Sequence, residues 1–192
     1  IAIWILNYCE YRSLAEPEKY YSIIFELNEF RLKKGLAYYP KGQIPKLLFL
    51  RIINVALLLG KNKWARKFLR DYSSKLHPEL IAPVNAMANA FIFFDEGSYD
   101  AVLEQLKDFE LFDTRDKLSA RALIAKTYFE LNENELLLSY IDSSRHYLKS
   151  KKVSERFRVP FVYFLNSLQK LLNLRENPDN FDINRLFAEM RS

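Results

Sequence analysis

The sequence predicts an all-α protein built from stacked antiparallel helix pairs, and three observations support this prediction. Apolar residues recur at helical spacing along most of the 192 residues, 49% of which are hydrophobic. Glycine is scarce, with four residues, whereas sheet proteins of this size usually need more glycine in their turns. Turn sequences interrupt the helical pattern at Gly60, Gly97 and Asn132, which are 37 and 35 residues apart. Such an interval is typical of a repeated helix–turn–helix unit.

The first clear helix pair is predicted at residues 45–59 and 62–75. Gly60 is suited to end the first helix and Pro78 to block the second. The expected core stripe of the first helix is Leu47, Leu50, Ile53, Ala56 and Leu57. The expected core stripe of the second helix is Ala65, Phe68, Leu69 and Tyr72.

Two further pairs follow the same pattern, at residues 80–94 with 98–109 and at residues 116–131 with 134–149. Asp113 or Thr114 is suited to cap the helix that starts near residue 116. Leu69 and Leu106 are expected to be core residues of the second helices, so that truncation of either would cost about 2 to 5 kcal/mol.

The flanks are interpreted as less regular members of the same array. A helix over 17–34 would pair with the apolar run 1–6, and a helix over 154–174 would be kinked or started by Pro160. Residues 179–190 would form a short capping helix. The whole chain, 1–192, is therefore expected to be a single helical-repeat domain. Its approximate units are 1–40, 45–78, 80–112, 115–150 and 154–191.

The chain begins at Ile1 rather than Met, in a run that is too short to span a membrane. We interpret this run as part of a helix that begins upstream, in the C-terminal part of a longer protein. Its apolar side chains are expected to contact upstream repeats or a second copy of the chain. Cys9, the single cysteine, is expected to be a buried thiol and favours a cytoplasmic location.

Three segments resemble the tetratricopeptide (TPR) pattern: Gly60 to Ala65, Gly97-Ser98-Tyr99-Asp100-Ala101, and Ala125 to Phe129. In that pattern a small residue in the first helix meets an aromatic residue, a glycine turn follows, and an alanine packs early in the second helix. The resemblance covers roughly residues 45 to 149. The chain departs from the pattern at Ile53, which replaces a small residue, and at Asn132, which replaces the turn glycine. The resemblance implies a right-handed α–α solenoid.

A helical solenoid offers partners the concave face formed by the first helices of its pairs. Aligning the three units by their turns places five residues nearest that face: Asn54, Phe91, Phe94, Lys126 and Phe129. Aromatic anchors with an amide and a cation suit an extended peptide. Two alternatives stay open: Glu130 could neutralise Lys126, and the phenylalanines could simply pack between repeats.

Motifs for catalysis are not found, and neither are motifs for cofactors or metals. The chain has no GxGxxG, GxxxxGK[ST], GxSxG or HExxH sequence, and no Cys/His cluster that could hold zinc. His77 and His146 are separate along the chain, and Asp95 and Glu96 precede a turn glycine, where solvated acids are ordinary. We therefore expect a protein that is not an enzyme and has no cofactor.

Charge is distributed in blocks. Residues 41–80 hold nine basic and two acidic residues, for a net charge of +7, whereas residues 81–142 have a net charge of −7 and residues 143–192 one of +5. The pattern favours a protein or peptide partner of mixed charge, or self-association. The alternative is an RNA-binding helical repeat, but the central acidic block would repel a phosphate backbone, so nucleic acid is the less favoured partner.

Overall fold

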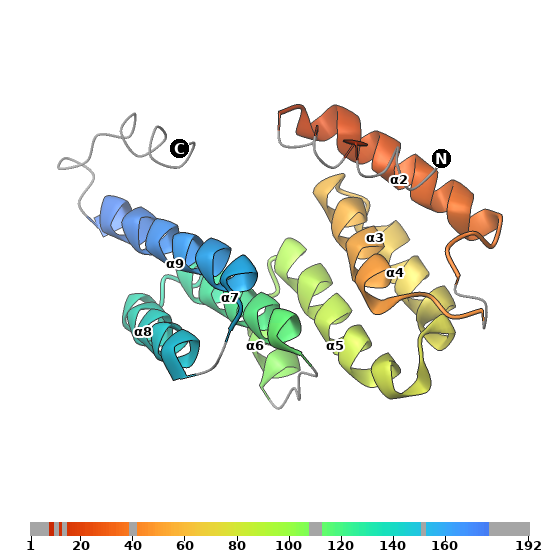
Figure 1. Ribbon diagram of the computed structural model, residues 1–192. Coiled ribbons are helices and arrows are strands. Elements are labelled where there is room, and N and C mark those ends of the chain that lie inside the picture. The colour runs from red at the N-terminus through yellow and green to blue at the C-terminus, as the bar shows by residue number, and fades with distance from the viewer. Residues whose placement is uncertain are drawn as a thin grey trace. The chain divides into compact units, whose positions relative to one another are not determined.

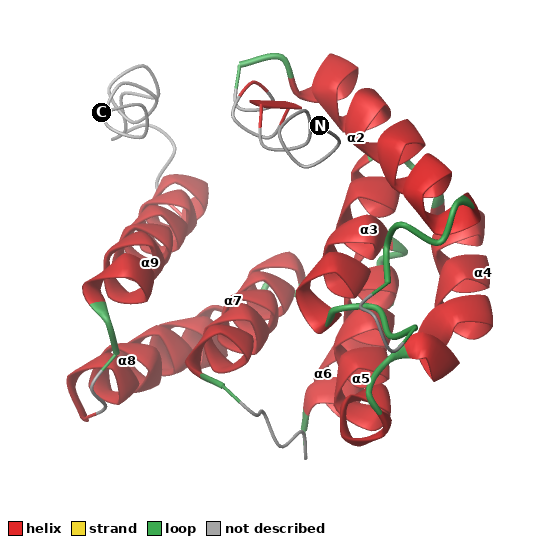
Figure 2. Cartoon of the chain, turned by 45° about the vertical axis from the view of Figure 1, so that its right-hand side comes forward, coloured by secondary structure: helices red, strands yellow, loops and turns green. Residues whose placement is uncertain are grey.

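A computed structural model describes residues 8–9, 12, 15–38, 42–107, 113–150 and 153–176, and within them the protein is all-α, without a strand (Figures 1 and 2). The helices, numbered as in Figure 1, are α2 (Pro17–Lys33), α3 (Lys46–Leu58), α4 (Asn62–Tyr72), α5 (Pro78–Asp95), α6 (Tyr99–Leu106), α7 (Thr114–Glu130), α8 (Asn134–Ser150) and α9 (Glu155–Glu176). A short 3-10 helix, Ser73–Lys75, follows α4. The predicted helices within these residues are confirmed to within a few positions at their ends.

The chain divides into two compact units, Ile1–Phe109 and Glu110–Ser192. In the first unit, α3 contacts α2, α4 and α5, while α4 also contacts α5, and α5 pairs with α6. In the second unit, each of α7, α8 and α9 contacts the other two. The two triplets α3–α4–α5 and α7–α8–α9 therefore share one pattern of contacts, in which a helix packs on its hairpin partner and both pack on the helix that follows.

The turns between the paired helices share one backbone geometry. At the end of α3, Gly60 N–H donates to the Leu57 carbonyl (2.8 Å) and Lys61 N–H to the Ala56 carbonyl (2.9 Å). These two bonds define a Schellman motif, which needs a left-handed residue at the position of Gly60, where φ is +65°. The same pair of bonds closes the helices before Gly35, Gly97 and Asn132. The turns predicted from sequence are thus confirmed, and Asn132 takes a left-handed φ of +60°.

Helix starts also follow from local sequence. Pro17 and Pro78 occupy the first turns of α2 and α5. Backbone N–H groups in a first turn have no acceptor within the helix, so a proline there costs no helical hydrogen bond. The Asp113 side chain accepts a hydrogen bond from Asp116 N–H (3.0 Å), which confirms the predicted cap of α7. Pro160 does not start α9, because the helix begins at Glu155 and continues through the proline.

Each unit has its own hydrophobic core. In the first unit, buried side chains of α2 to α5 surround Phe49, Ile53 and Phe68. Within this unit Cys9 and Leu106 are buried, as predicted. The prediction that Leu47 is a core residue is wrong, since Leu47 is 46% exposed. Leu50, Leu69 and Tyr72 of the predicted stripes are partly buried and pack against the core.

The core of the second unit joins α7, α8 and α9. Its largest fully buried side chains are Leu137, Ile141, Leu165 and Leu172. The predicted opening run and the predicted helix over 179–190 lie outside the described residues.

Polar contacts join the turn of one helix pair to the end of the next helix in both units. In the first unit, Asn62 Nδ2 donates to Asp95 Oδ2 (2.7 Å), and Arg66 forms a two-pronged ion pair with Glu96 (Nε to Oε1, 2.8 Å). In the second unit, Asn134 Nδ2 donates to Glu176 Oε1 (2.8 Å). The first residue of α4 and that of α8 therefore make the same kind of link.

Candidate peptide-binding surfaces

The five residues predicted for a concave face are divided between the two units. Asn54 on α3 and Lys126 on α7 are exposed, whereas Phe91 and Phe94 on α5 and Phe129 on α7 are half-buried. The exposed pair occupies the same position relative to its turn, six residues before Gly60 and Asn132, respectively. Aligning the helix pairs by their turns therefore correctly placed Asn54 and Lys126 at solvent-exposed positions.

The three phenylalanines are engaged within the fold. Phe91 packs against the first core, and the Phe94 ring meets the edge of Tyr99 at 5.5 Å between centroids. Phe129 lies under the guanidinium of Arg175, whose carbon is 4.2 Å from the ring centroid, and Arg175 Nη1 donates to the Phe129 carbonyl (2.7 Å). Phe129 is therefore covered by α9. Asn54 and Lys126 are the exposed members of the set, and Lys126 Nζ lies 5.8 Å from the centroid of the Phe164 ring on α9.

One face of α3 combines exposed apolar and polar side chains. Leu47, Asn54 and Leu58 follow one another at spacings of seven and four residues, which places them on one side of the helix. Leu58 is 62% exposed. Arg51 lies between them at half burial, and that burial lowers the pKa of its guanidinium. This face offers a partner both apolar area and hydrogen-bonding groups.

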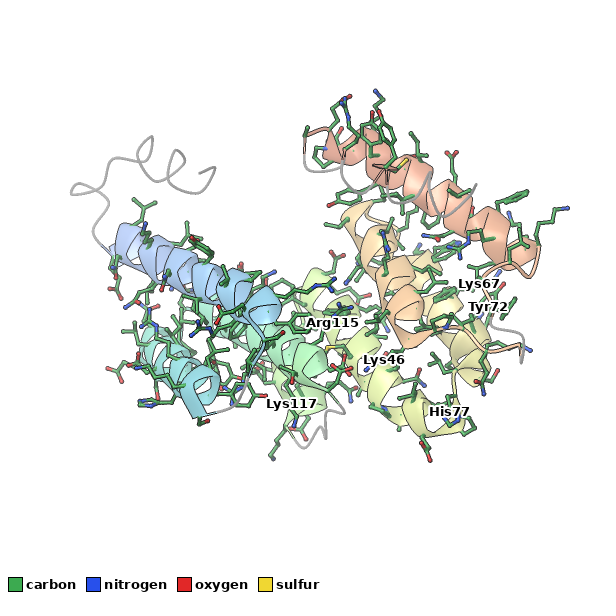
Figure 3. The ribbon with its side chains drawn as sticks, in the orientation of Figure 1. Lys46, Lys67, Tyr72, His77, Arg115 and Lys117 are labelled. Carbon is green, nitrogen blue, oxygen red and sulfur yellow. The ribbon has the colours of Figure 1, made fainter. Side chains whose placement is uncertain are left out.

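A second surface, which we call the α2–α4 groove, lies in the first unit and encloses about 220 Å³. From α2 it is lined by Glu29, Leu32 and Lys33. From α4 it is lined by Trp64, Lys67, Phe68, Asp71 and Tyr72. Figure 3 labels Lys67 and Tyr72, which lie beside the C-terminal part of α2.

An aromatic ladder along α4 forms the apolar wall of this groove. Trp64 stacks on Phe68 with an angle of 6° between ring planes and 5.3 Å between centroids, and Phe68 stacks on Tyr72 at 4.9 Å. The four-residue spacing puts the three rings on one face of the helix. Phe25 of α2 packs edge-on against Trp64, and Phe49 of α3 packs against Phe68. The ladder is therefore held rigid by rings from two neighbouring helices.

The charged side chains at the rim of the groove differ in whether they have a hydrogen-bond or ionic partner. Glu29 accepts a hydrogen bond from Trp64 Nε1 (3.1 Å), and Asp71 pairs with Arg70 Nε (2.9 Å). Lys33 and Lys67 are exposed and make no ion pair with another described residue. The rim consequently presents two acids that are already engaged and two ammonium groups that are available.

Phe68 is buried, as predicted from its place in the core stripe, but the groove beside it was not predicted. The signal was present in the regular spacing of Trp64, Phe68 and Tyr72, because aromatic residues four apart share a helix face. The position of α2 against that face could not be read from the spacing. A stripe that serves as core and a stripe that forms a groove wall look alike until the neighbouring helix is placed.

The described histidines and acidic side chains do not gather into a metal site. His77 and His146 are exposed on different units, and no group of three or more His, Cys, Asp or Glu side chains in the described part could hold a metal ion. None of the described helices combines the length and apolar character needed to cross a membrane. No protein-family model, curated protein or solved structure matches the chain.

Proposed function

We propose that the protein is a non-catalytic scaffold that binds proteins or peptides through stacked helix pairs, arranged as a TPR-like right-handed solenoid. The observation that supports this most is the repetition of one local design in two units. Identical Schellman turns end α3, α5 and α7, and the triplets α3–α4–α5 and α7–α8–α9 make the same contacts. A repeated unit of this kind leaves one helix face of each pair unpartnered along the array.

The exposed faces of the helices favour a binding role. On α3, Leu47 and Leu58 are exposed on either side of Asn54, and on α9 Tyr163 is 69% exposed beside exposed Val159 and Val162. Contiguous exposed apolar side chains are characteristic of interaction surfaces. Aromatic and aliphatic anchors supply most of the binding free energy in such surfaces, while polar neighbours fix the register of the partner.

The test is affinity capture with the wild-type chain and with an Asn54→Arg plus Lys126→Glu variant. Both residues are exposed, so the variant should keep its helical circular dichroism spectrum, although it loses the contact of Lys126 with the Phe164 ring. We expect recovery of the captured proteins to fall severalfold. A matched control, Ser139→Arg plus Lys149→Glu, makes the same changes of charge at exposed positions of α8 and should leave recovery unchanged. Equal recovery by all three folded proteins would rule out these helix faces.

A further inference from the structure

We propose that the α2–α4 groove binds an acidic segment of a partner protein, which inserts one large apolar side chain against the ladder of Trp64, Phe68 and Tyr72. This proposal rests on the proposed scaffold function and assigns it a second surface, distinct from the faces of α3 and α7.

The size and lining of the groove suit a single large side chain. An apolar cavity of about 150 Å³ is enough to hold benzene, so about 220 Å³ has room for one aromatic or long aliphatic group. Trp64 and Tyr72, which are partly exposed, supply the accessible apolar lining, and the buried Leu32 and Phe68 lie beneath it. The stacking of the three rings fixes this wall before a partner arrives, which lowers the entropy lost on binding.

The rim selects the charge of the segment that carries this side chain. Glu29 and Asp71 are already bound to Trp64 and Arg70, whereas Lys33 and Lys67 have no ionic partner among the described residues. An acidic segment would complete the rim, and its carboxylates would be attracted by the +7 net charge of residues 41–80.

Single-stranded RNA is the other ligand that basic and aromatic surfaces recruit, and the ring geometry disfavours it. Bases bind by stacking on free aromatic faces. Here the two faces of Phe68 are taken by Trp64 and Tyr72, and Trp64 is also packed by the edge of Phe25.

The test is selection of a displayed random-peptide library on the full chain, followed by fluorescence anisotropy with the selected peptides. We expect enrichment of peptides with several acidic residues around one aromatic or long aliphatic residue. Lys33→Glu plus Lys67→Glu should weaken their binding by about tenfold or more, because attraction becomes repulsion at two rim positions. Lys34→Glu plus Lys63→Glu makes the same change outside the groove lining and should weaken binding much less. Replacing the apolar residue of the peptide with serine should abolish binding.

The possible results separate this proposal from the scaffold function. Peptides that respond to Asn54→Arg plus Lys126→Glu but not to the Lys33 and Lys67 variant would overturn the groove and leave the scaffold intact. A failure to enrich any peptide would count against both. The proposal would be overturned in favour of nucleic acid by two results together. Labelled single-stranded RNA would bind the wild type but not the Lys33→Glu plus Lys67→Glu variant, and no acidic peptide would be enriched.

Discussion

Single residues in the turns decide where the helices of this protein end. Gly97 has φ of +72° and Asn132 has φ of +60°, a left-handed backbone that glycine adopts freely and that asparagine tolerates better than most residues. Each of the two residues is followed by a second helix that folds back on the first. The glycine punctuation of the sequence therefore corresponds to a specific backbone geometry, and Asn132 serves the same role as glycine.

Substitution at these turns gives the first prediction. Gly97→Ala should lower the free energy of unfolding by about 1 to 2 kcal/mol, the cost of a left-handed alanine. A Cβ at this position would meet no heavy atom within 4 Å, so the cost is one of backbone conformation alone. Asn132→Gly should raise the free energy of unfolding by less than about 1 kcal/mol. Urea unfolding measures both changes.

A matched control is Gly97→Asn, which should lose less stability than Gly97→Ala because asparagine tolerates the left-handed region. Equal stability of the glycine and alanine proteins would contradict the turn geometry.

Residue-level burial was harder to predict than the turns. In α3 apolar residues occur on almost every side, as the segment Lys46–Leu58 reads KLLFLRIINVALL. Periodicity defines a buried face only when a polar face opposes it, so it could not separate exposed Leu47 from buried Phe49 and Ile52. The amphipathic helix α4 was easier, and its buried Ala65 and Phe68 were both predicted.

At the scale of helices, burial differences give the second prediction. Leu106 on α6 is 6% exposed, and its truncation to alanine should cost about 2 to 5 kcal/mol. Leu69 on α4 lies at the edge of the core, so Leu69→Ala should cost less, on the order of 1 to 2 kcal/mol. Chemical denaturation of the two variants should show this order. A larger loss at Leu69 than at Leu106 would mean that the faces of α4 or α6 are placed wrongly.

The ion pair between α4 and α5 gives the third prediction. Hydrogen bonding by Arg66 holds the pKa of the Glu96 carboxyl below its ordinary value. Because the folded-state pKa is the lower one, the pair stabilises the fold above the ordinary pKa of glutamate. This stabilisation is lost as the pH falls through the lowered pKa. Both side chains are partly exposed, so the contribution is at most about 1 kcal/mol.

Glu96→Gln should therefore reduce stability near neutral pH and have little effect in acid, where the wild-type carboxyl is protonated. Thermal unfolding across the acid range measures this dependence. Glu104→Gln on α6 is the control, since Glu104 is exposed and forms no ion pair with another described residue. A stability loss from Glu96→Gln that is independent of pH would contradict the assigned role.

At the scale of the whole molecule, helix order and turn positions were predictable because both depend on local sequence. Surfaces were not, because they depend on which helices meet. The prediction that Phe129 faces a groove did not anticipate Arg175, which lies 46 residues further along the chain and covers its ring. The α2–α4 groove likewise requires Glu29 and Trp64, separated by 35 residues, to lie side by side.

The most direct test of a helical scaffold is hydrogen–deuterium exchange of the full chain, alone and with a captured protein or selected peptide bound. A partner held by helix surfaces slows exchange in the elements it covers. We expect slower exchange in α3 and α7 for a partner on the faces of Asn54 and Lys126, or in α2 and α4 for an acidic peptide in the groove. Binding that leaves the exchange of all four helices unchanged would contradict the account.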